Sequence, residues 1–362
     1  MNIDFKSMDD EMKKLYTVLW KDNEFIVNSV NHIEQSIDRR YKAPSRNSYW
    51  FSGKEKPKEL LMKIFGIANP EQFKEKFKMA VSGSGQEDKK ILTLHSSSLC
   101  ALLHFYNVTE VNTMTLSLGT DKKQRTVEFT KSVFEFKSPV IINPSNMDVV
   151  LIGKDTESDE DVVLFLESKF AEYYTSASSA RKGISQKYLN NKYGADLYKD
   201  NVLTRLGLKR KKTDTKNFEL VSMSEPFYIE GIKQMISHYI GIRNVLNKKY
   251  YIEKKSCNAS KQKEVEDTIE KGNGGKGAIV ILGEIVFDRF IGDLELKPGL
   301  KCGAIYSQKY EILADEIGKL IKNETDESVK RFEILKKELG YSLFLTNPHI
   351  IEDRINKFYK EK

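Results

Sequence analysis

The chain has 362 residues, of which 40% are hydrophobic and 31% charged, so it can bury a large core and is not intrinsically disordered. No apolar run approaches the roughly eighteen residues of a membrane span, and the acidic, amphipathic start MNIDFKSMDDEMKK is unlike a signal peptide, which favours a cytoplasmic protein. The net charge of +7 is compatible with nucleic acid as a partner, although a soluble protein from a lysine-rich proteome would show it equally.

Residues 1–90 are predicted to form an N-terminal helical region. Ser7 begins an S-x-x-D capping pattern for a first helix. Further along, Pro57 suits the first turn of a helix that Gly66 would end. Asn69-Pro70 suits the start of another helix, and the sequence Ser82-Gly83-Ser84-Gly85 then breaks the pattern.

A different pattern begins at residue 91, and we expect a core that extends to residue 300. Serines at 96–98 offer caps for a short apolar helix over residues 99–106. Segments with strand character follow at 114–118 and 126–136. Two further apolar runs, Val149–Ile152 and Val162–Leu166, have the length of buried strands and are separated by a polar, acidic turn.

Charged side chains stand at the ends of these last two strands. Asp148 opens the first, and the second ends in Glu167-Ser168-Lys169. Side chains at positions i and i+2 of a strand share a face, so Glu167 and Lys169 project together. If the two strands pair as a hairpin, Asp148 lies beside Glu167. Two carboxylates and one ammonium suit Mg²⁺ and a phosphate group.

The order of these residues resembles the signature of the PD-(D/E)XK nuclease superfamily, in which Asp is followed after a variable gap by Glu/Asp-x-Lys on the next strand. A helix leading into antiparallel strands is the element order of that core, and HSSSLCALLHFYN is similar to the helix before the catalytic sheet in a group of bacterial members. The chain departs from the signature at the proline, because Pro144 lies four positions before Asp148. The resemblance implies an α/β (α+β) fold: a restriction-endonuclease-like mixed central β-sheet flanked by helices, with added N- and C-terminal helices.

The resemblance also implies a function, that of a Mg²⁺-dependent DNA endonuclease of restriction type or a defence nuclease. Asp148, Glu167 and the backbone carbonyl of Ser168 would hold the metal, and Lys169 would position the attacking water and stabilise the phosphate. Such enzymes are often homodimers, because two DNA strands need two sites. A DNA-repair nuclease fits the same residues equally well.

A helix over residues 231–241 is predicted to bring more polar groups to this site. In the superfamily the helix after the Glu-x-Lys strand often presents a polar residue to the active site, and Gln234 occupies such a helix here. His238 follows one turn later on the same face, where it is either a site residue or a hydrogen-bonded histidine of the core. An upstream acidic ligand would be Glu34 or Glu59.

The triplet Glu-x-Lys has little specificity alone, since it also begins at Glu11, Glu135, Glu253 and Glu295. Glu135 is not favoured as the catalytic glutamate, because no aspartate-led strand comes just before its strand. The strongest competitor is the alternating segment 293–297, and a third interpretation of the 148/167/169 group is a hairpin with a purely structural salt bridge.

A basic segment at 171–220 follows the proposed catalytic strand, with eleven basic and five acidic residues and interleaved tyrosines. Basic groups neutralise phosphates and aromatic rings stack on bases, so this segment is predicted to contact DNA. The alternative is a solvated insertion whose tyrosines pack beneath it. The basic residues we expect at DNA are Arg181, Lys182, Lys187, Lys209, Arg210, Lys211 and Lys212.

Two other kinds of site are not supported. The glycine-rich run 272–277 precedes a strand instead of following one and lacks Ser/Thr after its lysine, so it is a turn and not a P-loop. The three cysteines have no metal-type spacing, which argues against structural zinc.

The last region, residues 301–362, is predicted to be helical, with Ser307 capping one helix, Gly340 ending another and Asn347-Pro348 opening the last, and residues Tyr341–Leu345 are predicted to add an edge strand. Two rivals to the nuclease remain for the whole chain. One is a nucleic-acid-binding module without catalysis, and the other is an interaction protein with no nucleic-acid partner.

Overall fold

The computed structural model describes residues 57–82, 91, 96–141, 144–170, 184–189, 197, 200–211, 214–220, 228–248, 259–288 and 301–344. Predictions that concern Ser7, Glu34, the segment 293–297 and Asn347-Pro348 therefore lie outside the described residues. Within them, no helix is both long and apolar enough to cross a bilayer.

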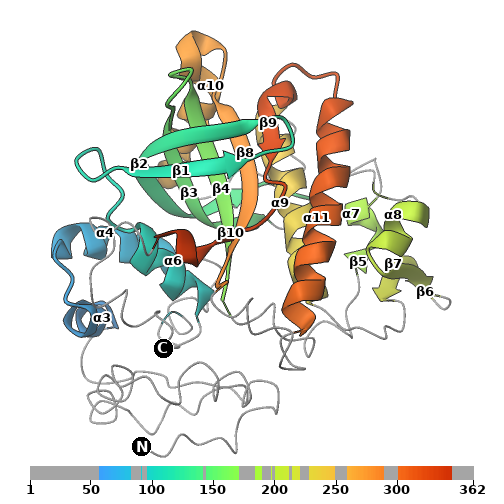
Figure 1. The fold of residues 1–362 in the computed structure, drawn as a ribbon, viewed down its shortest axis with the longest axis horizontal. Helices are drawn as coiled ribbons and strands as arrows, with labels where there is room; N and C mark the ends of the chain where they lie inside the picture. Colours follow the sequence, from blue (N-terminus) through green and yellow to red (C-terminus); the bar gives the residue numbers. More distant parts are fainter. Residues whose placement is uncertain are drawn as a thin grey trace, which may run out of the picture.

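A curled mixed sheet lies at the centre of the fold (Figure 1). Among the described residues it has seven strands in the order β1-β2-β3-β4-β8-β10, and β9 also pairs with β8. Strands β1 to β4 are antiparallel to one another, whereas β8 is parallel to β4, β9 and β10. The strands are β1 (Met114–Gly119), β2 (Gln124–Ser138), β3 (Ser145–Asp155), β4 (Asp161–Lys169), β8 (Ile279–Val286), β9 (Phe332–Ile334) and β10 (Leu339–Gly340).

Helices surround this sheet, so the protein has a mixed α/β fold, as predicted. In Figure 1, α9 and α11 stand side by side at one flank, while α3, α4 and α6 gather near the lower left of the sheet. The helices are α3 (Pro57–Phe65), α4 (Pro70–Ala80), α6 (Ser97–Phe105), α9 (Ile229–Leu246), α10 (Ala259–Gly275) and α11 (Lys301–Lys322).

The predicted helix ends in the first half of the chain are confirmed. Gly66 follows α3 with a left-handed φ of 63°. The Asn69 side chain caps α4 by accepting the Gln72 N–H at 3.2 Å. The Ser96 hydroxyl caps α6 by accepting the Leu99 N–H at 3.1 Å.

The hairpin predicted from residues 148–169 is also confirmed, because β3 and β4 pair in antiparallel register from Val149↔Leu166 to Lys154↔Asp161. Strand β4 lies between β3 and β8, so both of its edges are paired, and helices α6 and α10 also pack against it. This explains why Val162–Leu166 is continuously apolar and fully buried.

Part of the basic segment forms a small separate sheet in the order β5-β7-β6, with two short helices beside it. Its elements are β5 (Ile184–Ser185), α7 (Gln186–Leu189), α8 (Asp200–Arg205), β6 (Leu208–Lys211) and β7 (Asp214–Leu220). Through α8 this unit contacts α11.

The C-terminal region differs from its prediction. Helix α11 begins at Lys301, not at Ser307, and the chain then returns to the sheet as β9 and β10. Gly340 lies in β10 and does not end a helix, and Tyr341–Phe344 is a 3₁₀ helix, not an edge strand. Strands of two or three residues are too short to show a periodicity, and their place is fixed by parallel pairing with β8.

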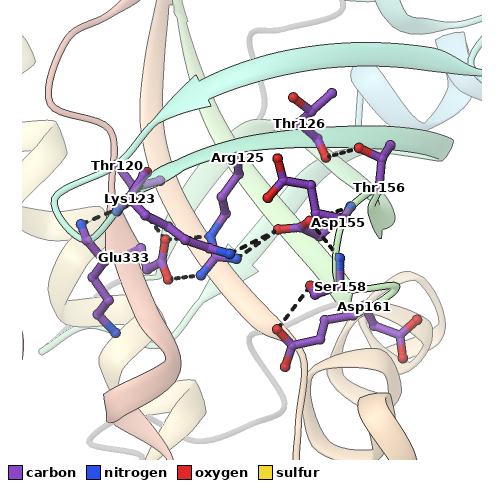
Figure 2. Close-up of polar contacts among 12 residues, drawn as sticks. Thr120, Lys123, Arg125, Thr126, Asp155, Thr156, Ser158, Asp161 and Glu333 are labelled. Carbon is purple, nitrogen blue, oxygen red and sulfur yellow. Dashed lines mark hydrogen bonds and ion pairs between the residues drawn. The ribbon is translucent and has the colours of Figure 1, made fainter.

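A buried ion-pair network joins β9 to β2 and β3 (Figure 2). The Arg125 guanidinium on β2 donates to both carboxylate oxygens of Glu333 on β9, and its Nη1 donates to Asp155 Oδ2 on β3 at 2.9 Å. The Thr120 hydroxyl adds a bond to Glu333 at 2.7 Å. Arg125, Asp155 and Glu333 are 7%, 1% and 2% exposed. Arg125 is therefore the buried cation shared by two buried carboxylates, and the half-exposed Lys123 adds a second contact to Asp155, with its Nζ 3.8 Å from Oδ2.

We expect Arg125→Met to lower the free energy of unfolding by about 3–5 kcal/mol, because it leaves the buried Glu333 carboxylate without its cation and Asp155 with only the half-exposed Lys123. The matched control is Lys154→Met, which removes a lysine from an exposed ion pair with Asp159 on the same sheet and should change stability little. Urea denaturation of the three proteins measures both values. Equal stability of the two variants would contradict a structural role for the Arg125 network.

Candidate active site

The β3–β4 hairpin brings the predicted carboxylates together. The pairing of Val149 with Leu166 places Asp148 and Glu167 opposite each other at the next position. The Ser168 backbone N–H donates to Asp148 Oδ2 at 2.8 Å, which fixes that carboxyl against the end of β4. The conditional prediction that Asp148 lies beside Glu167 is thereby confirmed.

Lys169 joins Glu167 to α9. Its Nζ donates to Glu167 Oε1 at 2.6 Å and to Gln234 Oε1 at 2.8 Å. Glu167 and Lys169 are only 4% and 2% exposed, so their ion pair lies in the protein interior. The ammonium is also 5.9 Å from the centre of the Tyr228 ring. Helix α9 thus presents Gln234 to this group, as the sequence suggested.

His238 contacts the same carboxylate from the next turn of α9. Its Nε2 lies 2.9 Å from Glu167 Oε2, and its Nδ1 lies 2.6 Å from the Ser145 hydroxyl at the start of β3. His238 is 1% exposed. The interpretation as a buried, hydrogen-bonded histidine is therefore confirmed, and a role at the site stays a prediction that its contact with Glu167 permits.

Some of these groups line a pocket of about 570 Å³, whereas Lys169 lies just behind its lining residues Glu167 and Gln234. Asp148, Glu167, Gln234 and His238 contribute to its wall, and so does Tyr188 from the basic segment. Glu59 is not among its lining residues. The remaining lining residues are Ser98, Glu135, Lys137, Pro144, Ser145, Asn146, Glu230, Lys233 and Ser237.

Glu135 is a pocket residue that sequence reasoning missed. The pairs Phe134↔Val149 and Phe136↔Met147 flank it, so Glu135 faces Asp148 across β2 and β3. Its φ of 55° lies in the left-handed region, which is uncommon for a residue other than glycine and is often found at functional sites. The sequence contains the Glu135-x-Lys137 triplet, but it gives no sign of the left-handed backbone at Glu135.

The charges in the pocket influence one another strongly. Burial alone would raise the pKa of Glu167, but Lys169 and His238 outweigh it and lower that pKa to about 2. Burial raises the pKa of Asp148 well above its usual range, and repulsion from Glu167 and Glu135 adds to the effect. Burial would lower the pKa of Lys169, yet Glu167 and the other nearby acidic groups raise it. The result is a carboxylate–ammonium pair beside a carboxyl group that ionises with difficulty.

Whether this group fits a metal depends on the kind of ion. Within the described ranges, no three His, Cys, Asp or Glu side chains converge closely enough to hold a metal by themselves. Mg²⁺, however, commonly takes one or two carboxylates and completes its shell with water and phosphate oxygens. Asp148 is half-buried at the pocket wall, and a cation there would relieve its repulsion with Glu167 and Glu135. The residues fit such an ion.

The predicted DNA contacts are placed only in part. Lys187 lies on α7, and Lys209, Arg210 and Lys211 lie on β6 of the small sheet. Arg181, Lys182 and Lys212 are outside the described residues. Tyr188, next to Lys187, reaches the pocket wall, so this part of the basic segment adjoins the site.

No protein-family model, curated protein or solved structure gives a significant match to this chain.

Another buried carboxyl group lies next to the ion pair, on the neighbouring strand β8. Glu284 on β8 is the register partner of Glu167 on β4 and is fully buried. The Tyr306 hydroxyl, from α11, lies 2.8 Å from each of its carboxylate oxygens. Gly231 on α9 leaves room for this tyrosine, since a Cβ there would clash with the Tyr306 hydroxyl. Burial raises the pKa of Glu284 well above its usual value.

This raised pKa predicts the sign of a pH effect on stability. Glu284 releases its proton at a higher pH in the folded protein than in the unfolded chain. Its contribution to stability is therefore fully present below the unfolded pKa and is lost as the pH rises through the folded pKa. We expect Glu284→Gln to flatten that part of the stability profile. Urea denaturation at several pH values checks this, and parallel profiles for the two proteins would contradict it.

Proposed function

We propose that this protein is a Mg²⁺-dependent endodeoxyribonuclease that hydrolyses phosphodiester bonds. The observation that carries the proposal is the Lys169 ammonium, held between Glu167 and Gln234 at the strand ends where Asp148 meets Glu167. An ammonium beside two carboxylates at a pocket is the arrangement that phosphate hydrolysis with a hard metal ion needs.

The order of elements supports the same assignment. Helix α6 leads into antiparallel strands, β3 brings Asp148, β4 brings Glu167 and Lys169, α9 brings Gln234, and β8 pairs in parallel with β4. This succession is consistent with a restriction-endonuclease-like fold. A fold alone does not determine an activity, so the proposed activity depends on the residues of the pocket.

Each residue has a distinct role in the proposed reaction. Asp148 and Glu167, with the Ser168 carbonyl, would hold the metal. Lys169 would orient the attacking water and offset the negative charge that builds on the phosphate. Gln234 positions the Lys169 ammonium by accepting its hydrogen bond. Bound Mg²⁺ supplies Lewis acidity and stabilises the leaving oxygen.

We further propose DNA as the substrate, with a restriction-type or defence role. The basic segment adjoins the pocket through Tyr188, and Lys137 and Lys233 add cations to the pocket wall. Basic groups around a cleft supply the affinity for a phosphate backbone. A homodimer would bring two such sites to the two strands of one duplex. A repair nuclease would use the same pocket.

Plasmid cleavage tests the proposal. With Mg²⁺ the wild-type protein should cut DNA, and EDTA should stop it. Asp148→Ala and Lys169→Ala should each lower the rate by at least about 10²–10³-fold, because each removes a group that stabilises charge in the transition state. Lys169→Ala should still bind DNA.

Lys154→Ala is the matched control, since it removes an exposed lysine from the strand that carries Asp148. Its cleavage rate should equal that of the wild type. Unchanged turnover in Lys169→Ala, or cleavage without a metal, would contradict the assignment. Tight, salt-sensitive DNA binding with no cleavage in any divalent metal would favour a binding module instead.

A further inference from the structure

Ser145, His238 and Glu167 form a continuous hydrogen-bonded chain beside the ion pair. Ser145 Oγ lies 2.6 Å from His238 Nδ1, and His238 Nε2 lies 2.9 Å from Glu167 Oε2. The three residues are 8%, 1% and 4% exposed. Water therefore competes little for these contacts, and each group depends on its neighbour in the chain for a partner.

The chemistry of the groups sets the direction of the bonds. An ionised carboxylate only accepts hydrogen bonds, so the proton between His238 and Glu167 belongs to Nε2. In that tautomer Nδ1 is an acceptor, and the Ser145 hydroxyl is the donor that it meets.

We propose that Ser145 and His238 are positioning residues that hold the Glu167 carboxylate in one orientation for the metal. This proposal rests on the proposed function. The terminal torsion of a glutamate is soft, and without His238 the carboxylate could turn both of its oxygens toward Lys169. With one oxygen bound to Lys169 and the other to His238, the plane of the carboxylate is fixed. Its remaining lone pairs then face a constant direction.

The same three residue types in this order also form a nucleophile, a base and an orienting acid in serine hydrolases. Here the acid is shared with a buried lysine, because Glu167 Oε1 is bound to Lys169 Nζ. We therefore assign the chain to the support of Glu167 and not to attack by Ser145. Stoichiometric labelling of Ser145 by a fluorophosphonate would overturn this assignment.

Side-chain nitrogen NMR of the full-length protein tests the proton positions without any turnover. The five histidines are distinguished by comparing the wild type with His238→Gln. We expect His238 to carry a proton on Nε2, the nitrogen that faces Glu167. A ring protonated on Nδ1 alone would leave Glu167 without this donor and would overturn the proposal whether or not the protein cleaves DNA.

A pair of substitutions tests the positioning role. The amide nitrogen of glutamine lies as many bonds from Cβ as Nε2 of histidine, whereas that of asparagine matches Nδ1. His238→Gln should therefore keep a donor for Glu167, and His238→Asn should lose it. Loss of a residue that orients a metal ligand lowers metal affinity or activity by about 10–100-fold.

We expect His238→Asn to show this full loss in Mn²⁺ affinity and in the cleavage rate. His238→Gln should show only a small part of it. Thermal melting confirms that both variants are folded. Equal affinities in the two folded variants would overturn the positioning role. The titration needs no cleavage, so a protein that shows the expected difference in Mn²⁺ affinity but never cuts DNA would contradict the proposed function alone.

Discussion

The ion pair between Lys169 and Glu167 is the interaction on which the pocket depends. Both charged groups are almost fully buried, at 4% and 2% exposure, so each depends on the other and on further polar contacts for its stability. Gln234 provides a further hydrogen-bond acceptor for the Lys169 ammonium, and His238 contacts the second oxygen of the Glu167 carboxylate. Asp148 stands beside this pair with a raised pKa, which makes it the group whose ionisation a bound cation would favour most.

The fold supplies the pair through strand pairing. Antiparallel β3 puts Asp148 opposite the end of β4, and parallel β8 puts Glu284 on its other side. Helix α9 then covers the strand ends and brings Gln234 and His238 one turn apart to the same carboxylate–ammonium pair. Farther along the sheet, Arg125 contacts two buried carboxylates in a similar way, but there its ion pairs join β2 to β3 and β9.

Much of this arrangement was predictable from the sequence, because the relevant signals are local. The hairpin follows from two apolar runs around a polar turn, and the alternation of a strand places Glu167 and Lys169 on one face. Glu135 was missed because its place depends on a left-handed backbone angle within a strand. Ser145 and Glu284 were missed because one contacts α9 and the other lies on a strand more than a hundred residues away from Glu167. Long-range pairing of that kind leaves no pattern in a single sequence.

The most direct measurement of the central claim is the anomalous diffraction of Mn²⁺ in crystals of the wild-type protein. We predict a peak in the pocket, at about the 2.0–2.1 Å coordination distance of a small hard cation from carboxylate oxygens of Asp148 and Glu167. The Lys169 ammonium should stay in contact with Glu167. Absence of a peak at these carboxylates at saturating Mn²⁺, or binding only at other surface groups, would contradict the metal-dependent nuclease.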